Sequence, residues 1–152
     1  MIFVTISKGA FDRLIKSVDS LAERIDEDIV MQIGNTRHIP RNTQFFRFCS
    51  KKEMDDYYKK ADLIITHGGA GSLFSALRFS KKCIAVPRYR EFGEHVDDHQ
   101  LQIVRELAKE KRVIAVYDVN ELEEAISKAR NFKPELNRDS SLVDHIKSII
   151  DS

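Results

Sequence analysis

Cysteine, long apolar runs and an excess of one charge are all scarce in this sequence, and each shortage excludes a class of protein. The two cysteines, Cys49 and Cys83, both lie in apolar segments, which argues against a disulfide scaffold. No apolar run approaches the roughly 20 residues that span a bilayer. The first residues also lack the basic region of a signal peptide. We therefore expect a protein of a reducing, cytosolic compartment.

The charge balance gives no reason to expect nucleic-acid binding. Lys and Arg number 25 against 24 Asp and Glu, so the formal net charge is +1. No internal repeat is visible, and a chain of 152 residues with 42% apolar residues is large enough for one buried core. We therefore expect a single domain over residues 1–152.

Six short apolar, mostly β-branched runs recur along the chain. They do not alternate with polar residues, which is typical of parallel strands buried on both faces of a sheet. Amphipathic helical patterns lie between most of these runs, and only the segment 33–44 joins two of them without a helix. The sequence thus predicts an α/β fold with a doubly wound parallel sheet. The predicted strands are Ile2–Ile6, Ile29–Ile33, Thr43–Phe48, Leu63–Thr66, Cys83–Val86 and Val113–Val116.

The last helical pattern follows a linker-like stretch, Asn131–Asp139. Apolar residues at helical spacing predict a terminal helix within residues 140–151. This helix either packs on its own domain or presents its apolar face to a partner.

A glycine-rich turn with the sequence His-Gly-Gly-Ala-Gly-Ser follows the fourth predicted strand. The start of a helix attracts anions through its unpaired amides and its dipole, and glycines let the backbone approach a phosphate. The turn matches neither the dinucleotide fingerprint nor the P-loop. A purely structural tight turn is the alternative. The candidate ligand-binding residues are Gly68, Gly69, Ala70, Gly71 and Ser72.

Polar residues also follow the first and fifth predicted strands. Ser7 and Lys8 end the first strand, and Arg88 follows the fifth. Ligands of doubly wound sheets bind beyond the carboxyl ends of the strands. We therefore expect these residues beside the glycine turn, where Lys8 would meet a phosphate as a point charge or remain a solvated side chain.

A second polar cluster occupies Glu94–Gln100. His95 and His99 are four residues apart and would share one face of a helix. This spacing suggests zinc, but Val96 stands where the zinc-peptidase motif has glutamate. Either of the two consecutive aspartates between the histidines can instead cap the next helix. The remaining interpretation is ligand contact by His99 and Gln100, whose donors and acceptors suit sugar hydroxyls.

These blocks, in this order, resemble the C-terminal, donor-binding half of family 28 glycosyltransferases. The resemblance covers nearly the whole chain. It is closer to stand-alone versions of that half, namely the soluble catalytic subunit of the dolichol-linked N-acetylglucosamine transferase and bacterial capsule or exopolysaccharide subunits. The matching blocks are Ile2–Thr5 with Phe11–Ile15, Ala61–Ser72, Val86–Arg88 and Phe92–Gln100.

The resemblance implies a Rossmann-like half of a GT-B fold that uses a UDP-sugar and needs no metal or other cofactor. Gly69–Ser72 would hold the diphosphate, main-chain groups near Phe48 and Cys49 the uracil, and His99 with Gln100 the donor sugar. The resemblance does not extend to the acceptor-binding half of the family, which we expect on another polypeptide. The resemblance therefore implies a second, membrane-associated subunit that brings a lipid-linked acceptor and supplies the general base.

Two positions depart from the family pattern. Many relatives carry Gly-Thr where this chain has Ser7 and Lys8, and many carry a ribose-binding glutamate at the position that we align with Ser75. These changes keep a non-catalytic, nucleotide-binding or regulatory subunit as a second hypothesis. A flavodoxin-like or receiver-like signalling domain is a third, although a receiver would have acidic residues where Ser7 and Lys8 stand.

Overall fold

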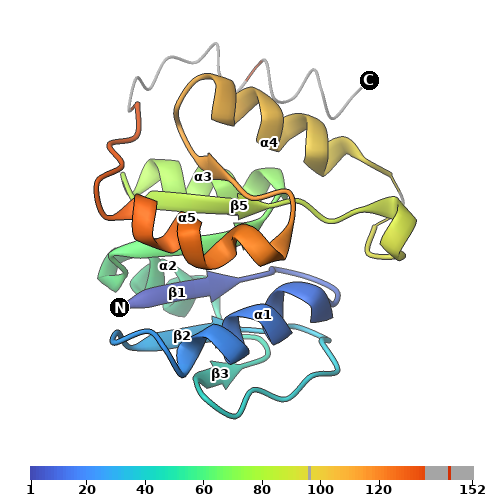
Figure 1. Cartoon of the computed structure of the whole chain (residues 1–152), viewed down its shortest axis with the longest axis vertical. Coiled ribbons are helices and arrows are strands. Elements are labelled where there is room, and N and C mark those ends of the chain that lie inside the picture. The colour runs from blue at the N-terminus through green and yellow to red at the C-terminus, as the bar shows by residue number, and fades with distance from the viewer. Residues whose placement is uncertain (96, 136–143, 145–152) are drawn as a thin grey trace.

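Six parallel strands form one sheet in the computed structural model, which describes residues 1–95, 97–135 and 144 (Figure 1). The strand order is β3-β2-β1-β4-β5-β6. All six predicted strands are present, with bounds that differ by at most two residues at either end. The strands are β1 (Ile2–Thr5), β2 (Ile29–Gln32), β3 (Gln44–Phe46), β4 (Leu63–His67), β5 (Lys82–Val86) and β6 (Ile114–Ala115).

The strand order reverses direction between β1 and β4. β1 lies at the middle of the sheet and pairs in parallel with both β2 and β4, so that Ile2 is opposite Ile29 on one side and Leu63 on the other. Chain segments leaving the ends of β1 and β4 lead to helices on opposite faces of the sheet, and ligands of doubly wound sheets bind at such a point. In Figure 1 this edge is at the right, where the strand arrows point.

Helices cover both faces of the sheet, as the apolar strands require. Successive strand residues face opposite sides: Ile2 and Val4 join one apolar cluster and Phe3 joins the other. Full burial of each such side chain contributes roughly 1.5–3 kcal/mol. The first cluster is covered by α1 (Asp12–Ala22) and α5 (Leu122–Ala129), and the second by α2 (Lys51–Lys60), α3 (Ala70–Arg78) and α4 (His99–Lys109) (Figure 1).

The segment 34–43 joins β2 to β3 without a helix, as predicted. Two carboxylates of α1 hold it instead. Asp19 accepts hydrogen bonds from the amides of Arg41 and Asn42, and its Oδ2 lies 2.7 Å from His38 Nε2. Asp12 Oδ1 accepts from the amides of residues 37 and 38. These bonds satisfy backbone groups that a regular element would otherwise pair.

Side chains satisfy backbone amides at the starts of α2 and α4. Ser50 Oγ accepts a hydrogen bond from the Glu53 amide, 3.2 Å away, as in a capping box. Of the two aspartates considered for α4, Asp97 makes the bond, from the His99 amide at 3.0 Å. Cys49 and Cys83 are both free thiols.

Two sequence predictions concern membranes and the chain end. No helix within the described part of the chain has the length and apolarity needed to cross a bilayer. The predicted terminal helix over residues 140–151 lies outside the described residues, apart from Asp144.

Candidate functional site

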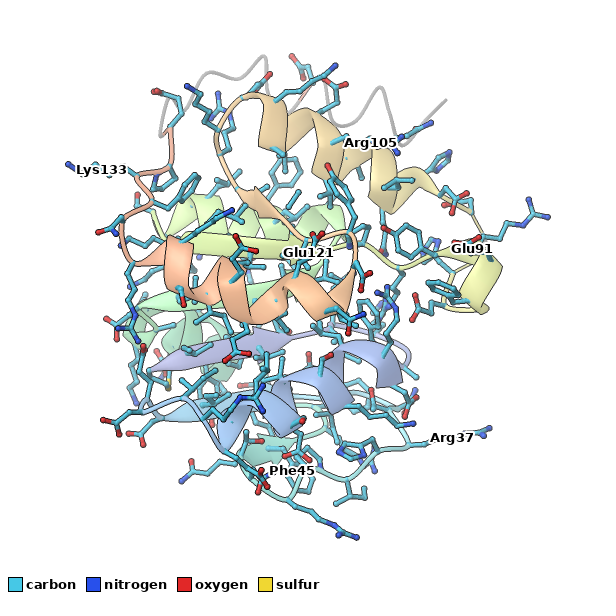
Figure 2. All side chains as sticks on the ribbon, viewed as in Figure 1. Arg37, Phe45, Glu91, Arg105, Glu121 and Lys133 are labelled. Carbon is cyan, nitrogen blue, oxygen red and sulfur yellow. The ribbon has the colours of Figure 1, made fainter. Side chains whose placement is uncertain are left out.

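The carboxyl edge brings together the polar turns predicted from the sequence. The turns after β1, β4 and β5 follow three adjacent parallel strands. Arg88 links two of them, because its Nη2 donates to the Ile6 and Lys8 carbonyls at 3.0 and 2.7 Å. Its own amide donates to Gln100 Oε1 at 3.2 Å, which adds the start of α4. Arg37 and Glu91, labelled in Figure 2, mark the same side of the molecule.

The three glycines of the turn after β4 have different roles. A Cβ on Gly69 would lie 2.0 Å from the His67 ring, and one on Gly68 would lie 2.8 Å from Gln100. These two glycines therefore allow the imidazole and α4 to pack tightly against the turn. A Cβ on Gly71 would have no heavy atom within 4 Å. Of the three, only Gly71 faces open space, where a ligand could approach.

The start of α3 leaves amides free for an anion. Gly69 is the N-cap residue and has no side chain with which to accept a hydrogen bond. The first helical bond runs from the Leu73 amide to the Gly69 carbonyl at 3.1 Å, so the amides of residues 70–72 have no intrahelical acceptor. Ser72 does not act as a cap, since its Oγ faces His67 Nε2 at 3.4 Å. Tyr58 anchors the same turn by donating to the Ser72 carbonyl.

His67 lies beneath this turn as a buried, neutral imidazole. It is only 5% exposed. Burial, and then the nearby Arg88 charge, lower the pKa of His67 from 6.5 to about 3. A neutral ring beside Ser72 can orient the hydroxyl without bringing a second positive charge next to the guanidinium.

A pH dependence of stability follows from this burial. The pKa of His67 is lower in the folded protein, so the unfolded chain binds more protons between pH 6.5 and about 3. The stability is therefore complete above pH 6.5 and falls as the pH drops through this window. We expect the wild type to lose up to about 1.4 kcal/mol per pH unit more than His67→Asn between pH 6 and 4. Urea unfolding of both proteins across this range measures the difference, and parallel curves would contradict it.

The turn after β1 is shaped by left-handed backbone. Ser7 has φ +60° and Gly9 has φ +76°. The buried Gln32 side chain holds this turn, since its Oε1 accepts from the Ser7 amide and its Nε2 donates to the Ser7 and Arg47 carbonyls. Lys8 is exposed beside the turn. Gln32 thereby ties the β1 turn to the end of β3.

The residues predicted to contact the uracil follow β3. Phe48 is 57% exposed, and Cys49 is half-buried. Ser75, which the sequence analysis aligns with a ribose-binding glutamate, is half-buried on α3. Phe48 and Cys49 lie just beyond the carboxyl end of β3, and the contact of all three residues with a ligand stays a prediction.

The histidines of the second cluster share one carboxylate. Asp97 Oδ1 lies 3.2 Å from His95 Nδ1, and its Oδ2 lies 3.5 Å from His99 Nδ1. The His99 amide is the main cause of the lowered pKa of Asp97. Within the described ranges, no three His, Cys, Asp or Glu side chains form a group that could hold a metal ion. Asp97 therefore organises the start of α4.

Sequence reasoning missed several residues that shape this edge. Arg88 and Gln100 were predicted as ligand contacts, and the structure gives both of them bonds within the protein. Gln32 and Arg13 were not candidate site residues, and Glu94 was named only as the first residue of the second polar cluster. A polar residue inside the apolar run 29–33 was the one available signal for Gln32, whereas nothing local indicated that Arg13 and Glu94 would meet.

Comparison with known proteins gives a consistent result. A family model described as the glycosyltransferase family 28 C-terminal domain matches residues 1–151. The human UDP-N-acetylglucosamine transferase subunit ALG13 is 31% identical over 121 residues, covering 72% of this chain and 10% of that protein. The Candida albicans protein of the same name is 27% identical over 107 residues, covering 70% of this chain and 33% of that protein. The chain thus spans about a tenth of the length of the human relative and about a third of the length of the Candida albicans relative.

Solved structures resemble the whole chain. The NMR solution structure of ALG13 superposes with a TM-score of 0.64 at 19% identity, over 99% of this chain and 95% of that one. The crystal structure of Acinetobacter baumannii MurG superposes with a TM-score of 0.66 at 15% identity, over 99% of this chain and 49% of that one. These likenesses confirm the predicted Rossmann-like half of a GT-B fold.

Proposed function

The chain belongs to the glycosyltransferase family 28 C-terminal domain family, and from this membership we propose that it is the donor-binding catalytic subunit of an inverting, UDP-sugar-dependent glycosyltransferase. The family and the fold establish a glycosyltransferase domain. They leave no support for the flavodoxin-like or receiver-like alternative. The nucleotide, the acceptor and the catalytic role are our proposal.

The start of α3 is the proposed diphosphate site. The observation that carries this assignment is the open space at Gly71, beside amides that have no intrahelical acceptor. The positive end of the helix dipole favours the diphosphate, and favours it more as charge develops on the leaving UDP. Lys8, exposed on the neighbouring turn, adds a positive charge.

The other predicted contacts extend along the same edge. Phe48 and Cys49 would contact the uracil at the end of β3, while His95, His99 and Gln100 would contact the donor sugar at the start of α4. In this arrangement the diphosphate lies between the uracil and the sugar. The strand order of the sheet supports it, because β4 lies between β3 and β5. No metal ion or other cofactor is part of the proposal.

The acceptor is proposed to arrive with a second subunit. The ALG13 relatives are named as transferase subunits, which supports a partner. We assign the general base to that partner, because the imidazole at His67 is buried and engaged with Ser72. A membrane-anchored partner with a lipid-linked acceptor would place this chain at the cytoplasmic face of a membrane, and the terminal helix within residues 140–151 is our candidate docking element.

A non-catalytic nucleotide-binding subunit is the second candidate. The neutral Ser75 favours it, since a serine cannot make the bidentate ribose contact of the glutamate that relatives carry there. UDP binding without sugar transfer, in the presence of the partner, would favour this second candidate over the first.

Gly71→Asp tests the diphosphate site. We expect this variant to bind UDP at least tenfold more weakly than the wild type in isothermal titration, because its carboxylate would repel the diphosphate. Its thermal stability should not fall, since the position has open space and an acidic residue suits the first turn of a helix.

Gly71→Ala is the matched control. It adds one methyl group and no charge, and alanine favours a helix over glycine by about 1 kcal/mol. We expect a smaller loss of UDP affinity than for Gly71→Asp. Wild-type protein that binds no UDP at millimolar concentration would overturn the proposed function, whereas equal binding by Gly71→Asp and wild type would move the diphosphate elsewhere.

A further inference from the structure

An arginine on α1 reaches across the carboxyl edge to the segment between β5 and α4. Arg13 Nε and Nη2 each donate to one oxygen of Glu94, both at 3.0 Å, and Nη2 also donates to the Pro87 carbonyl at 3.0 Å. The Arg13 and Glu94 side chains are only 20% and 11% exposed. This is a bidentate pair in partly buried surroundings, the arrangement in which an Arg–carboxylate contact is strong and directional.

The segment folds around this pair. Glu94 Oε1 also accepts a hydrogen bond from the Tyr89 amide at 3.0 Å. The Arg13 guanidinium lies 5.1 Å from the Tyr89 ring centre and 5.2 Å from that of Phe92. The 3₁₀ turn Arg90–Phe92 is the regular structure found within the described part of 87–98. Backbone bonds from the amides of residues 92–94 to the Tyr89 and Arg90 carbonyls close this turn, and the contacts of Arg13 and Glu94 fix it against α1.

Arg88 makes the reverse connection, from the end of β5 to the β1 turn. Its guanidinium carbon lies 5.4 Å from the ring centre of the fully buried Phe11, and that of Arg13 lies 5.2 Å from the same ring. Arg13 and Arg88 thus both connect the segment after β5 with the region of α1 and the turn that precedes it. Together they join the two turns that lie on either side of the glycine turn.

We propose that Arg13 and Glu94 are positioning residues that set the discrimination of the donor's sugar. They hold residues 87–95, which the Arg90 amide joins to Asp98 at the start of α4, and so position His99 and Gln100 against the glycine turn. The nucleotide site at the ends of β3 and β4 does not depend on this pair. This inference rests on the proposed function, because it concerns the sugar end of the same site.

Arg24 and Glu123 provide a matched control pair. They form the same type of contact, with Arg24 Nη2 3.1 Å from Glu123 Oε2 and Nε 3.5 Å from Oε1. Both side chains are 55% exposed, and neither belongs to the turns of the carboxyl edge. Lysine at either arginine keeps the charge but removes the planar fork that allows two parallel bonds.

The experiment compares nucleotide and nucleotide-sugar affinities. The wild type, Arg13→Lys, Glu94→Gln and Arg24→Lys are titrated with UDP, UDP-glucose, UDP-galactose and UDP-N-acetylglucosamine, and hydrogen exchange is followed in residues 89–95. We expect Arg13→Lys and Glu94→Gln to change UDP affinity less than twofold. Each should alter the ratio of UDP-sugar to UDP affinity at least fivefold for one of the sugars, with faster exchange in the segment. Arg24→Lys should match the wild type in every measurement.

Two results would overturn the inference while the proposed function stands. In the first, the affinity ratios of Arg13→Lys and Glu94→Gln equal those of the wild type. In the second, UDP and all three UDP-sugars weaken together, which is the signature of a general structural role. A wild type that binds none of the four ligands would instead contradict the proposed function.

Discussion

Gly69→Ala is expected to destabilise the protein by about 3 kcal/mol or more, although it adds a single methyl group. The added Cβ would lie 2.0 Å from His67 Cε1 and 2.8 Å from both ring nitrogens. The imidazole cannot move aside easily, because it is buried beneath the turn. Urea unfolding at pH 7 measures the loss, and the start of α3 is the region expected to be distorted.

Rescue by a second substitution identifies the cause. His67→Ser removes the ring that the methyl group would strike, so the double variant should be more stable than the sum of the two single losses predicts. Gly71→Ala is the matched control, because its Cβ has no heavy atom within 4 Å and its stability should equal or exceed that of the wild type. Additive losses in the double variant would show that the His67 ring is not what requires glycine at position 69.

Gln32→Glu is the second substitution expected to have a large effect. Gln32 is 2% exposed, and its Nε2 donates to the Ser7 and Arg47 carbonyls at 2.9 and 2.8 Å. A carboxylate of the same shape has no proton to donate and would face both carbonyl oxygens as a buried charge. Thr5 Oγ1 and the Ile6 and Ser7 amides would still donate to one carboxylate oxygen, but the oxygen that replaces Nε2 would face two carbonyl oxygens with no donor. We expect a loss of roughly 3–5 kcal/mol at pH 7, because this buried, charged oxygen is left without a hydrogen bond.

The pH dependence of this variant distinguishes charge from shape. Protonation of the new carboxyl restores one donor, so its deficit relative to the wild type should shrink as the pH falls from 7 toward 4. Gln102→Glu on the exposed face of α4 makes the same chemical change and should cost less than about 0.5 kcal/mol. A deficit that does not change with pH would show that the buried charge is not its cause.

The fold was predictable because its main signal is local. β1, β2 and β4 are buried along their whole length, and each begins in the sequence with three consecutive apolar residues. The helix-free segment 34–43 was predictable from its lack of a helical pattern, whereas the carboxylates of Asp12 and Asp19 that hold it come from more than 20 residues away. The family followed from the order of four short blocks, and the match over residues 1–151 confirms it.

The site was only partly predictable. The glycine turn, the Ser7 turn and the start of α4 were all expected at one edge, and the parallel sheet places them there. The individual glycines could not be distinguished, because their roles depend on which side chain lies against each Cα. The sequence also gave no reason to separate a ligand contact from a residue bonded within the protein, as at Arg88 and Gln100.

The amino-acid sequence alone determined the fold class, the family and the edge of the sheet that carries the site, because all three depend on local patterns and on the parallel direction that those patterns predict for the strands. The tertiary structure alone decided that Gly71 is the open glycine, that His67 is neutral, and that Arg13 meets Glu94. Arg13 and Glu94 are 81 positions apart, so their contact exists only once β1 and β5 lie in the same sheet. The burial that lowers the pKa of His67 likewise requires packed neighbours from several elements.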